Sequence, residues 1–220
     1  TPIQEKAFSV VMSGRDVVGI AQTGTGKTYA YLLPILRQLA FSKQKDPRVL
    51  ILVPTRELAI QVAGEIQKLT TYMSVRTLAV YGGVNINTQK LAVQAGVDIL
   101  VGTPGRVLDM ALSRFLLLSS VRQLVIDEVD EMLNLGFRVQ LTGLLDRLPA
   151  RRQNLLFSAT MTDEVDDLIE TFFNGPVPVE VTRAGTPLEK IRQSAYRVSN
   201  FHTKLNLLEH LLATDDSIAK

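Results

Sequence analysis

Residues 17–28 read VVGIAQTGTGKT, an apolar run that leads straight into a glycine-rich turn ending in Lys-Thr. Residues 29–39 then follow a helical pattern. A buried strand, a glycine-rich turn and a helix N-terminus in this order form a site for phosphate, because backbone N–H groups of the turn and the positive end of the helix face the ligand. The stretch therefore predicts that the chain binds a nucleoside triphosphate.

The turn, called the phosphate loop below, consists of Ala21, Gln22, Thr23, Gly24, Thr25, Gly26, Lys27 and Thr28. Gly24 and Gly26 let the backbone approach the phosphates without a Cβ in the way. Lys27 is placed to reach the β- and γ-phosphates, and the Thr28 hydroxyl to bind Mg²⁺. Ala21 departs from the general pattern Gly-x4-Gly-Lys-[Ser/Thr], which has a glycine there. A chance glycine-rich turn is the alternative, and the flanking strand and helix argue against it.

The composition limits the class of protein. A chain of 220 residues with 46% hydrophobic residues predicts one α/β domain and part of another. No apolar stretch reaches the ~20 residues of a membrane span, so we expect no membrane contact. The absence of cysteine excludes disulfides and cysteine-based zinc sites and suits a cytoplasmic protein. The net charge of +2 is too small to indicate nucleic-acid binding, so any such site must be local. Because the chain starts at Thr1 without Met, we expect a piece of a longer protein.

Short β-branched runs alternate with helical segments along most of the chain. The expected strands are residues 16–20, 49–53, 77–80, 99–101, 124–126, 154–157 and 177–181. They are nearly continuous apolar runs, as in strands covered on both faces. Helical patterns include 58–69 and 163–173, the latter with Thr162 as N-cap. The alternation predicts an α/β fold with a doubly wound, mainly parallel sheet of about seven strands flanked by helices, whose ligands bind beyond the carboxyl ends of the strands.

The pattern changes after residue 181. We expect a first domain over 1–182, a linker over 183–193, and the truncated start of a second domain over 194–220. Residues 186–189 have capping-box spacing, which allows a short helix there. Residues 194–199 resemble a weak strand, and residues 203–213 a helix with an apolar face.

A second element of a nucleotide site lies about a hundred residues after the phosphate loop. Residues 124–130 read LVIDEVD, an apolar strand ending in two acids. Asp127 can hold Mg²⁺ directly or through water, and Glu128 can polarise an attacking water. A strand followed by an acidic helix N-terminus is the alternative, which the phosphate loop at this distance makes the weaker one. These residues, together with Lys27, are the candidate catalytic groups.

Residues 127–130, Asp-Glu-Val-Asp, resemble the signature tetrapeptide of the DEAD-box ATP-dependent RNA helicases, with Val129 in place of Ala. This family is similar to the present chain in carrying Ala at the start of its phosphate loop. Further motifs resemble the family's in the same order: TPIQ at 1–4, PTRELA at 54–59, GG at 82–83, TPGR at 103–106 and SAT at 158–160. The resemblance implies an N-terminal RecA-like domain that binds ATP and Mg²⁺ and works with a second RecA-like domain.

The resemblance also implies roles for individual residues. Gln4 would recognise adenine, and Asp130, Ser158 and Thr160 would couple nucleotide state to strand separation, with both hydroxyls in reach of Asp130. The implied contacts to the sugar-phosphate backbone of single-stranded or duplex RNA are Pro54, Thr55, Arg56, Gly82, Gly83, Thr103, Pro104, Gly105 and Arg106. Because these loops follow predicted strands, they belong at the same sheet edge as the phosphate loop. Few aromatic residues lie near these motifs, so we do not expect base stacking to dominate.

Two alternatives in function remain open at this stage. A nucleotide-gated RNA clamp or scaffold would use the same residues without net unwinding. A small-molecule kinase would explain Lys27 and Asp127 but leaves the PTRELA and SAT segments without a role. The sequence names neither the RNA nor the oligomeric state. Because the implied second domain would supply the arginines that complete the chemistry, we expect little ATP turnover from this chain alone.

Overall fold

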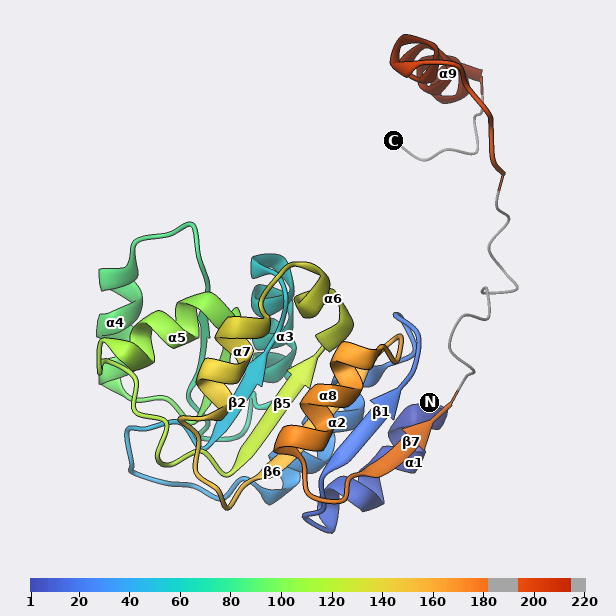
Figure 1. The fold of residues 1–220 in the computed structure, drawn as a ribbon. Coiled ribbons are helices and arrows are strands. Elements are labelled where there is room, and N and C mark those ends of the chain that lie inside the picture. The colour runs from blue at the N-terminus through green and yellow to red at the C-terminus, as the bar shows by residue number, and fades with distance from the viewer. Residues whose placement is uncertain (182–193, 215–220) are drawn as a thin grey trace. The chain divides into compact units, whose positions relative to one another are not determined.

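The computed structural model describes residues 1–181 and 194–214 (Figure 1). The chain forms two separate units. The boundary between the larger and the smaller unit lies at residues 185 and 186. None of the described helices is long and apolar enough to cross a membrane. The larger unit carries all of the candidate site residues.

The larger unit is built on one seven-stranded sheet of order β3-β4-β2-β5-β6-β1-β7. All neighbouring strands pair in parallel. The strands are β1 (Val17–Ile20), β2 (Val49–Leu52), β3 (Thr77–Val80), β4 (Ile99–Gly102), β5 (Gln123–Asp127), β6 (Gln153–Ser158) and β7 (Val177–Glu180). The predicted doubly wound parallel sheet is confirmed.

Helices cover both faces of this sheet, as Figure 1 shows. One face packs against α1 (Pro2–Met12), α2 (Lys27–Gln38) and α3 (Arg56–Leu69). The other packs against α4 (Ile86–Ala95), α5 (Pro104–Leu112), α6 (Val129–Asn134), α7 (Arg138–Leu145) and α8 (Asp163–Phe172). Successive residues of a strand enter opposite cores, so that Leu50 and Leu52 of β2 lie in one and Val49 and Ile51 in the other.

Gly19 brings the strand that feeds the phosphate loop close to its neighbour. A Cβ at this position would lie 2.5 Å from a ring carbon of Phe157 on β6. The Phe157 ring in turn packs against the Tyr31 ring of α2, with 5.4 Å between centroids. A larger residue at position 19 would push the Phe157 ring toward Tyr31 and so disturb the packing of β6 against α2.

The element bounds differ in detail from the sequence-based ones. Helix α2 begins at Lys27, two residues before the predicted start, because Gly26 adopts φ 94° and turns the chain into the helix there. Strands β5 and β6 each include one more residue at both ends, so they begin with the buried polar residues Gln123 and Gln153. Helix α1 was not predicted, although Pro2 stands at its first position, where proline is favoured.

The described part of the second unit consists of residues 194–200 and α9 (Phe201–Thr214). The predicted helix over 203–213 is confirmed. The predicted strand over 194–199 is wrong, since residues 194–198 have no regular structure and a strand needs a partner for its backbone groups. None of the described α9 side chains is buried. The expected linker over 183–193 and the possible short helix at 186–189 lie outside the described residues.

Candidate active site

The candidate residues gather at one edge of the sheet, where the strands end. Following the strand order, residues 82–83 come shortly after β3, 103–106 after β4, and 54–56 after β2. Asp127 ends β5, Ser158 ends β6, and residues 21–28 follow β1. The loops resembling RNA-contacting motifs therefore occupy one half of this carboxyl edge and the nucleotide residues the other half. The acidic segment at 127–130 joins the two.

The phosphate loop has the backbone that its glycines allow. Gly24 and Gly26 lie at φ 77° and 94°, a region that side chains disfavour. The Thr25 hydroxyl donates to the Gln22 carbonyl at 2.7 Å and closes the turn. Ala21 is buried in the core and donates its N–H to Ser158 O at 3.0 Å. The methyl group of Ala21 thus packs in the interior, which explains how the loop accommodates a residue other than glycine.

A cavity of about 460 Å³ opens beside this loop. Its lining includes the following residues of α2, α3, the phosphate loop and the end of β5: Thr23, Gly24, Gly26, Lys27, Thr28, Tyr29, Leu58, Gln61, Glu65, Asp127 and Glu128. Lys27 Nζ and Asp127 Oδ1 are both buried and have no hydrogen-bond partner. A buried cation and a buried carboxylate oxygen without partners are costly, and a bound phosphate and metal ion would satisfy both.

Asp127 is 3% exposed, and its two oxygens have different surroundings. Oδ2 accepts a hydrogen bond from the Tyr31 hydroxyl at 2.9 Å, which leaves Oδ1 as the oxygen available to a ligand. Burial raises the pKa of Asp127 to about 6, against the opposing effects of the nearby Lys27 charge and the Tyr31 bond. Burial beside this carboxylate also raises the pKa of Tyr31 well above its usual value, so the tyrosine stays a donor.

Glu128 lies in a strained backbone conformation. It sits between β5 and α6 with φ 55° and ψ 50°, a left-handed geometry that is unfavourable for a residue with a Cβ. The same residue lines the cavity beside Asp127. Strain of this kind is typical of functional positions, because the fold must hold the side chain in one place.

Gln4 contacts the phosphate loop from α1. Its Nε2 donates to the Gly26 carbonyl at 3.1 Å, and its Oε1 accepts from the Thr1 nitrogen at 3.0 Å. A Cβ on Gly26 would lie 2.5 Å from Gln4 Nε2, so this contact requires glycine. The predicted adenine contact of Gln4 remains a prediction, and its observed partners are the loop and its own helix.

Asp130 connects α6 to the residues after β6. Its Oδ2 accepts from Ala159 N at 3.2 Å, Thr160 N at 3.0 Å and the Thr160 hydroxyl at 2.8 Å. The expected bond from Thr160 is therefore present. The expected bond from Ser158 is wrong: its buried hydroxyl donates to Thr160 O at 2.7 Å, because it points along its own turn.

The arginines of the other half of the edge are partly held by the protein. The Arg56 guanidinium lies 5.1 Å above the ring of Tyr81, and Arg106 donates to Gln89 Oε1 at 2.8 Å and to Val84 O at 3.1 Å. The Thr55 hydroxyl accepts from Leu58 N at 3.2 Å and caps α3. Thr55 therefore has a structural role as the N-cap of α3.

The sequence interpretation missed two groups that shape this edge. Tyr31 lies four residues after Lys27, so both project from the same face of α2 toward β5. That spacing was the available signal for its contact with Asp127. Tyr81 directly precedes the two glycines at 82–83, and its ring packs against the Arg56 guanidinium. An aromatic ring therefore does lie in the half of the edge that holds the candidate RNA loops.

Known proteins resemble this chain in sequence and in fold. An ATP-dependent RNA helicase CshA of Listeria monocytogenes is 43% identical over 96% of this chain and 40% of its own length. An RNA helicase CrhR of Synechocystis is 39% identical over 98% of this chain and 44% of its own length. The chain spans about two fifths of the length of these curated relatives.

Two solved structures share the fold. A DEAD box protein from Methanococcus jannaschii matches with a TM-score of 0.79 and 35% identity, over 83% of this chain and 50% of that one. A hypothetical ATP-dependent RNA helicase from Sulfolobus tokodaii matches with a TM-score of 0.76 and 35% identity, over 82% and 52%. The family model described as DEAD/DEAH box helicase matches residues 1–168. The chain therefore belongs to the DEAD/DEAH box helicase family.

Proposed function

We propose that this chain is the N-terminal ATP- and RNA-binding domain of an ATP-dependent RNA helicase, which hydrolyses ATP to separate RNA strands locally. One observation carries the proposal: Lys27 Nζ and Asp127 Oδ1 are buried without partners in one cavity, beside a loop shaped for phosphate. The arginine-bearing loops resembling RNA-contacting motifs lie at the same sheet edge.

The residues of the cavity fit a magnesium-bound triphosphate. The N–H groups of residues 24–28 and the N-terminus of α2 would face the phosphates, and Lys27 Nζ would bond their outer oxygens. Thr28 and Asp127 Oδ1 would hold Mg²⁺, partly through water, and the ion would neutralise charge on the phosphates. Glu128, held by its strained backbone, orients the attacking water and accepts its proton.

The RNA half of the edge suits contacts that do not depend on base sequence. Loops and helix N-termini at 54–56, 82–83 and 103–106 supply backbone N–H groups, and Arg56 and Arg106 supply charge. The three hydrogen bonds on Asp130 Oδ2 link the acidic segment to the turn after β6. That link would carry the state of the nucleotide toward the RNA.

The remaining parts of the machine belong to a second RecA-like domain, which would supply the arginines that stabilise the leaving phosphate. The relatives support this view, because the chain matches only about two fifths of their length. The naming of these relatives as RNA helicases favours unwinding over a clamp without net unwinding. A cytoplasmic location is supported by the absence of cysteine.

The test is ATP hydrolysis and RNA unwinding by the full-length protein carrying Glu128→Gln. We expect turnover to fall about 10²- to 10⁴-fold while ATP affinity stays the same, because the base is lost and the phosphate contacts remain. Glu131→Gln, an exposed acid on α6, the helix that Glu128 precedes, is the matched control and should leave turnover unchanged. Wild-type turnover from Glu128→Gln, or a wild-type protein that hydrolyses ATP without separating strands, would refute the helicase assignment.

A further inference from the structure

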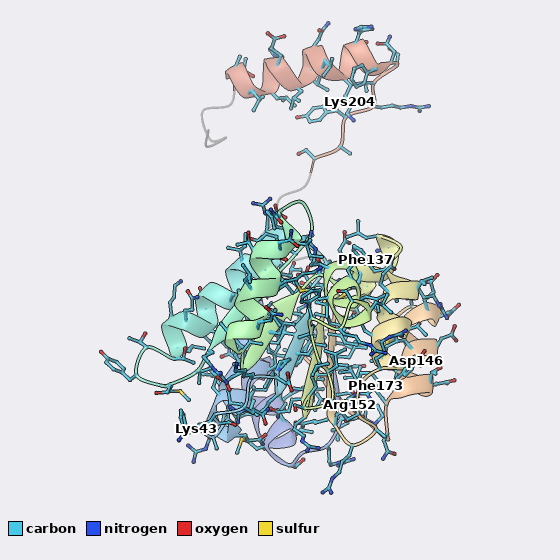
Figure 2. All side chains as sticks on the ribbon, turned by 90° about the vertical axis from the view of Figure 1, so that its left-hand side faces the viewer. Lys43, Phe137, Asp146, Arg152, Phe173 and Lys204 are labelled. Atoms are coloured by element: carbon cyan, nitrogen blue, oxygen red, sulfur yellow. The ribbon has the colours of Figure 1, made fainter. Side chains whose placement is uncertain are left out.

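The opposite edge of the sheet, where the strands begin, carries a row of arginines. Arg48, Arg122 and Arg152 directly precede β2, β5 and β6, and Arg15 stands two residues before β1. These four strands are consecutive neighbours in the sheet. Because neighbouring strands lie about 4.8 Å apart, the arginines follow one another at roughly that interval. The strands run upward in Figure 1, and Figure 2 labels Arg152 toward the lower end of the same unit.

Three neighbouring cavities follow this amino edge and share Gly14. One of about 330 Å³ is lined by Arg48 and Arg122 among others, and one of about 480 Å³ by Arg122, Arg151 and Arg152. The third, of about 370 Å³, is lined by Arg15, Arg151 and Arg152. Each cavity shares at least one arginine with the next, so together they form a furrow along the edge.

The cations of the furrow differ in how they are held. Arg48 pairs with Asp98 at 2.9 Å, and Arg152 donates to Asn154 Oδ1 and to Pro149 O, both at 2.8 Å. Arg15, Arg122 and Arg151 are exposed, and their side chains have no hydrogen bond or ion pair within residues 1–181 and 194–214. Two arginines therefore build the edge and three are available to a ligand.

The acidic side chain that lines the furrow is already hydrogen-bonded within the protein. Asp16 is the one acidic residue among the described residues that line the three cavities. It is 6% exposed, and its oxygens accept from Asn154 N at 2.7 Å, Asn154 Nδ2 at 3.0 Å and Asn174 N at 3.0 Å. The three available arginines thus face solvent with no carboxylate to neutralise them, which favours an anionic ligand.

We propose that this amino edge is a second phosphate-binding surface, which contacts the backbone of RNA away from the motif loops of the carboxyl edge. A row of guanidinium groups suits a polymer of phosphates, since each can bond phosphate oxygens in bidentate fashion. An acidic peptide fits less well, because the edge offers strand ends rather than the side of a strand with which a peptide backbone could pair. The choice of RNA among phosphate polymers rests on the proposed function.

The test measures binding of a fluorescein-labelled, unstructured 20-nucleotide RNA to the 220-residue chain at several salt concentrations. The variant Arg15→Gln/Arg122→Gln/Arg151→Gln removes the three unpaired cations and leaves Arg48 and Arg152 in place. We expect affinity at low salt to fall about tenfold, and the slope of log affinity against log salt to decrease by about 2, as counterion release by three cations predicts. Arg→Lys at the same three positions should restore most of the slope, because the charge returns.

A matched control removes the same charge elsewhere. Lys43→Gln/Arg114→Gln/Lys204→Gln changes three exposed cations that lie outside the furrow and, like those of the furrow, have no side-chain hydrogen bond or ion pair within the described residues. It should lower RNA affinity and the salt slope much less than the furrow variant does. Both variants should keep the wild-type midpoint of thermal unfolding and the wild-type ATP affinity, because none of the six side chains is buried or lines the nucleotide cavity.

A third variant, Arg56→Gln/Arg106→Gln, separates this proposal from the proposed function. If it abolishes RNA binding while the furrow variant binds like wild type, the furrow proposal is overturned and the proposed function stands. If the furrow variant loses binding and the motif variant keeps it, the furrow proposal is supported and the RNA role of the motif arginines fails. Equal loss in the furrow variant and its charge control, no RNA binding by any form, or tight binding of poly-glutamate instead of RNA would each overturn the furrow proposal.

Discussion

The two ends of the parallel strands differ in whether their buried polar groups have hydrogen-bond partners. At the carboxyl edge, Lys27 Nζ and Asp127 Oδ1 are buried without partners and Glu128 sits in a left-handed conformation. At the amino edge, Gln123 and Gln153 are buried with their amides engaged. Unsatisfied and strained groups cost free energy of folding, and they persist where a ligand satisfies them. The comparison separates an edge arranged for binding from a cluster arranged for stability.

The glutamine cluster shows how the amino edge is stabilised. Gln123 Nε2 donates to Gln38 Oε1 and to Gln153 Oε1, both at 2.9 Å. Gln153 Nε2 donates to Val11 O at 2.9 Å and to Arg15 O at 2.8 Å. These bonds join α2, β5 and β6 to the end of α1 and the turn that follows it. The cluster therefore fixes where β1, and with it the phosphate loop, begins.

Gln153→Leu should have the largest effect on stability. The leucine fills a similar volume but leaves Gln123 Nε2 with one acceptor fewer and the Val11 and Arg15 carbonyls without this donor. We expect the free energy of unfolding to fall by about 3 kcal/mol, with ATP affinity unchanged once the chain is folded. Urea unfolding and ATP titration measure the two quantities. Gln94→Leu, an exposed change on α4, is the control, and an equal loss from both would break the contrast between the edges.

Asp127→Asn should stabilise the nucleotide-free chain in a manner that depends on pH. Burial raises the pKa of Asp127 from 3.8 to about 6, so between these values the folded state holds a proton that the unfolded state releases. Stability from this group is therefore present below about pH 4 and lost as pH rises through about 6, by at most about 3 kcal/mol. Asparagine does not ionise, so the variant should match wild type below pH 4 and exceed it above pH 6.

Urea unfolding without nucleotide between pH 3.5 and 7.5 checks this expectation. Asp146→Asn, an exposed carboxylate at the end of α7, provides the control and should follow the wild-type curve. If the free energy of unfolding of Asp127→Asn stays parallel to that of wild type across the whole pH range, burial of the Asp127 carboxylate does not destabilise the folded state.

Much of the fold could be predicted from the sequence because its strands are apolar on both faces. Runs such as residues 49–52 have few other interpretations when helical patterns separate them. Gln123 and Gln153 could not be placed in strands on this basis, since a polar residue in a run reads as its end. Their burial depends on amide partners contributed by α1 and α2, which no local pattern reveals.

The site could be predicted to the extent that its residues lie in compact motifs. Residues 21–28 and 127–130 are contiguous and carry their chemistry in their own types and spacing. The partner of Ser158 could not be predicted, because whether a hydroxyl reaches Asp130 or its own turn depends on a single rotamer. The strain at Glu128 follows from the geometry between β5 and α6 and has no signal in residue type.

Lys27→Met tests through ATP binding whether the carboxyl edge is arranged for a ligand. The substitution keeps the aliphatic stem and removes a buried ammonium group that has no hydrogen-bond partner. ATP affinity should fall about 10- to 100-fold, since hydrogen bonds to a charged group are worth about 1.5–3 kcal/mol. The free energy of unfolding should not fall, because no hydrogen bond is lost and a buried charge without a partner is removed. Lys6→Met controls for the charge, and a large loss of stability in Lys27→Met would show that Lys27 supports the fold rather than the ligand.

The smallest expected effect concerns Thr160, where the carboxyl edge is satisfied by its own residues. Thr160→Val removes one of the three hydrogen bonds on Asp130 Oδ2 and leaves the two from backbone N–H groups. The free energy of unfolding should fall by about 1 kcal/mol or less, because one exposed hydroxyl bond is lost. A double-mutant cycle with Asp130→Asn should return a coupling of similar size.

Ser158→Ala is the matched partner in that cycle, since its hydroxyl bonds Thr160 O and not Asp130. We expect no coupling between Ser158→Ala and Asp130→Asn. If Asp130 serves to transmit nucleotide state, Thr160→Val should also reduce the change in ATP affinity that RNA produces, by more than its small effect on stability. A coupling that is larger for Ser158 than for Thr160 would mean that the turn after β6 rearranges in solution. In that case Ser158, and not Thr160, would be the hydroxyl that links Asp130 to the turn after β6.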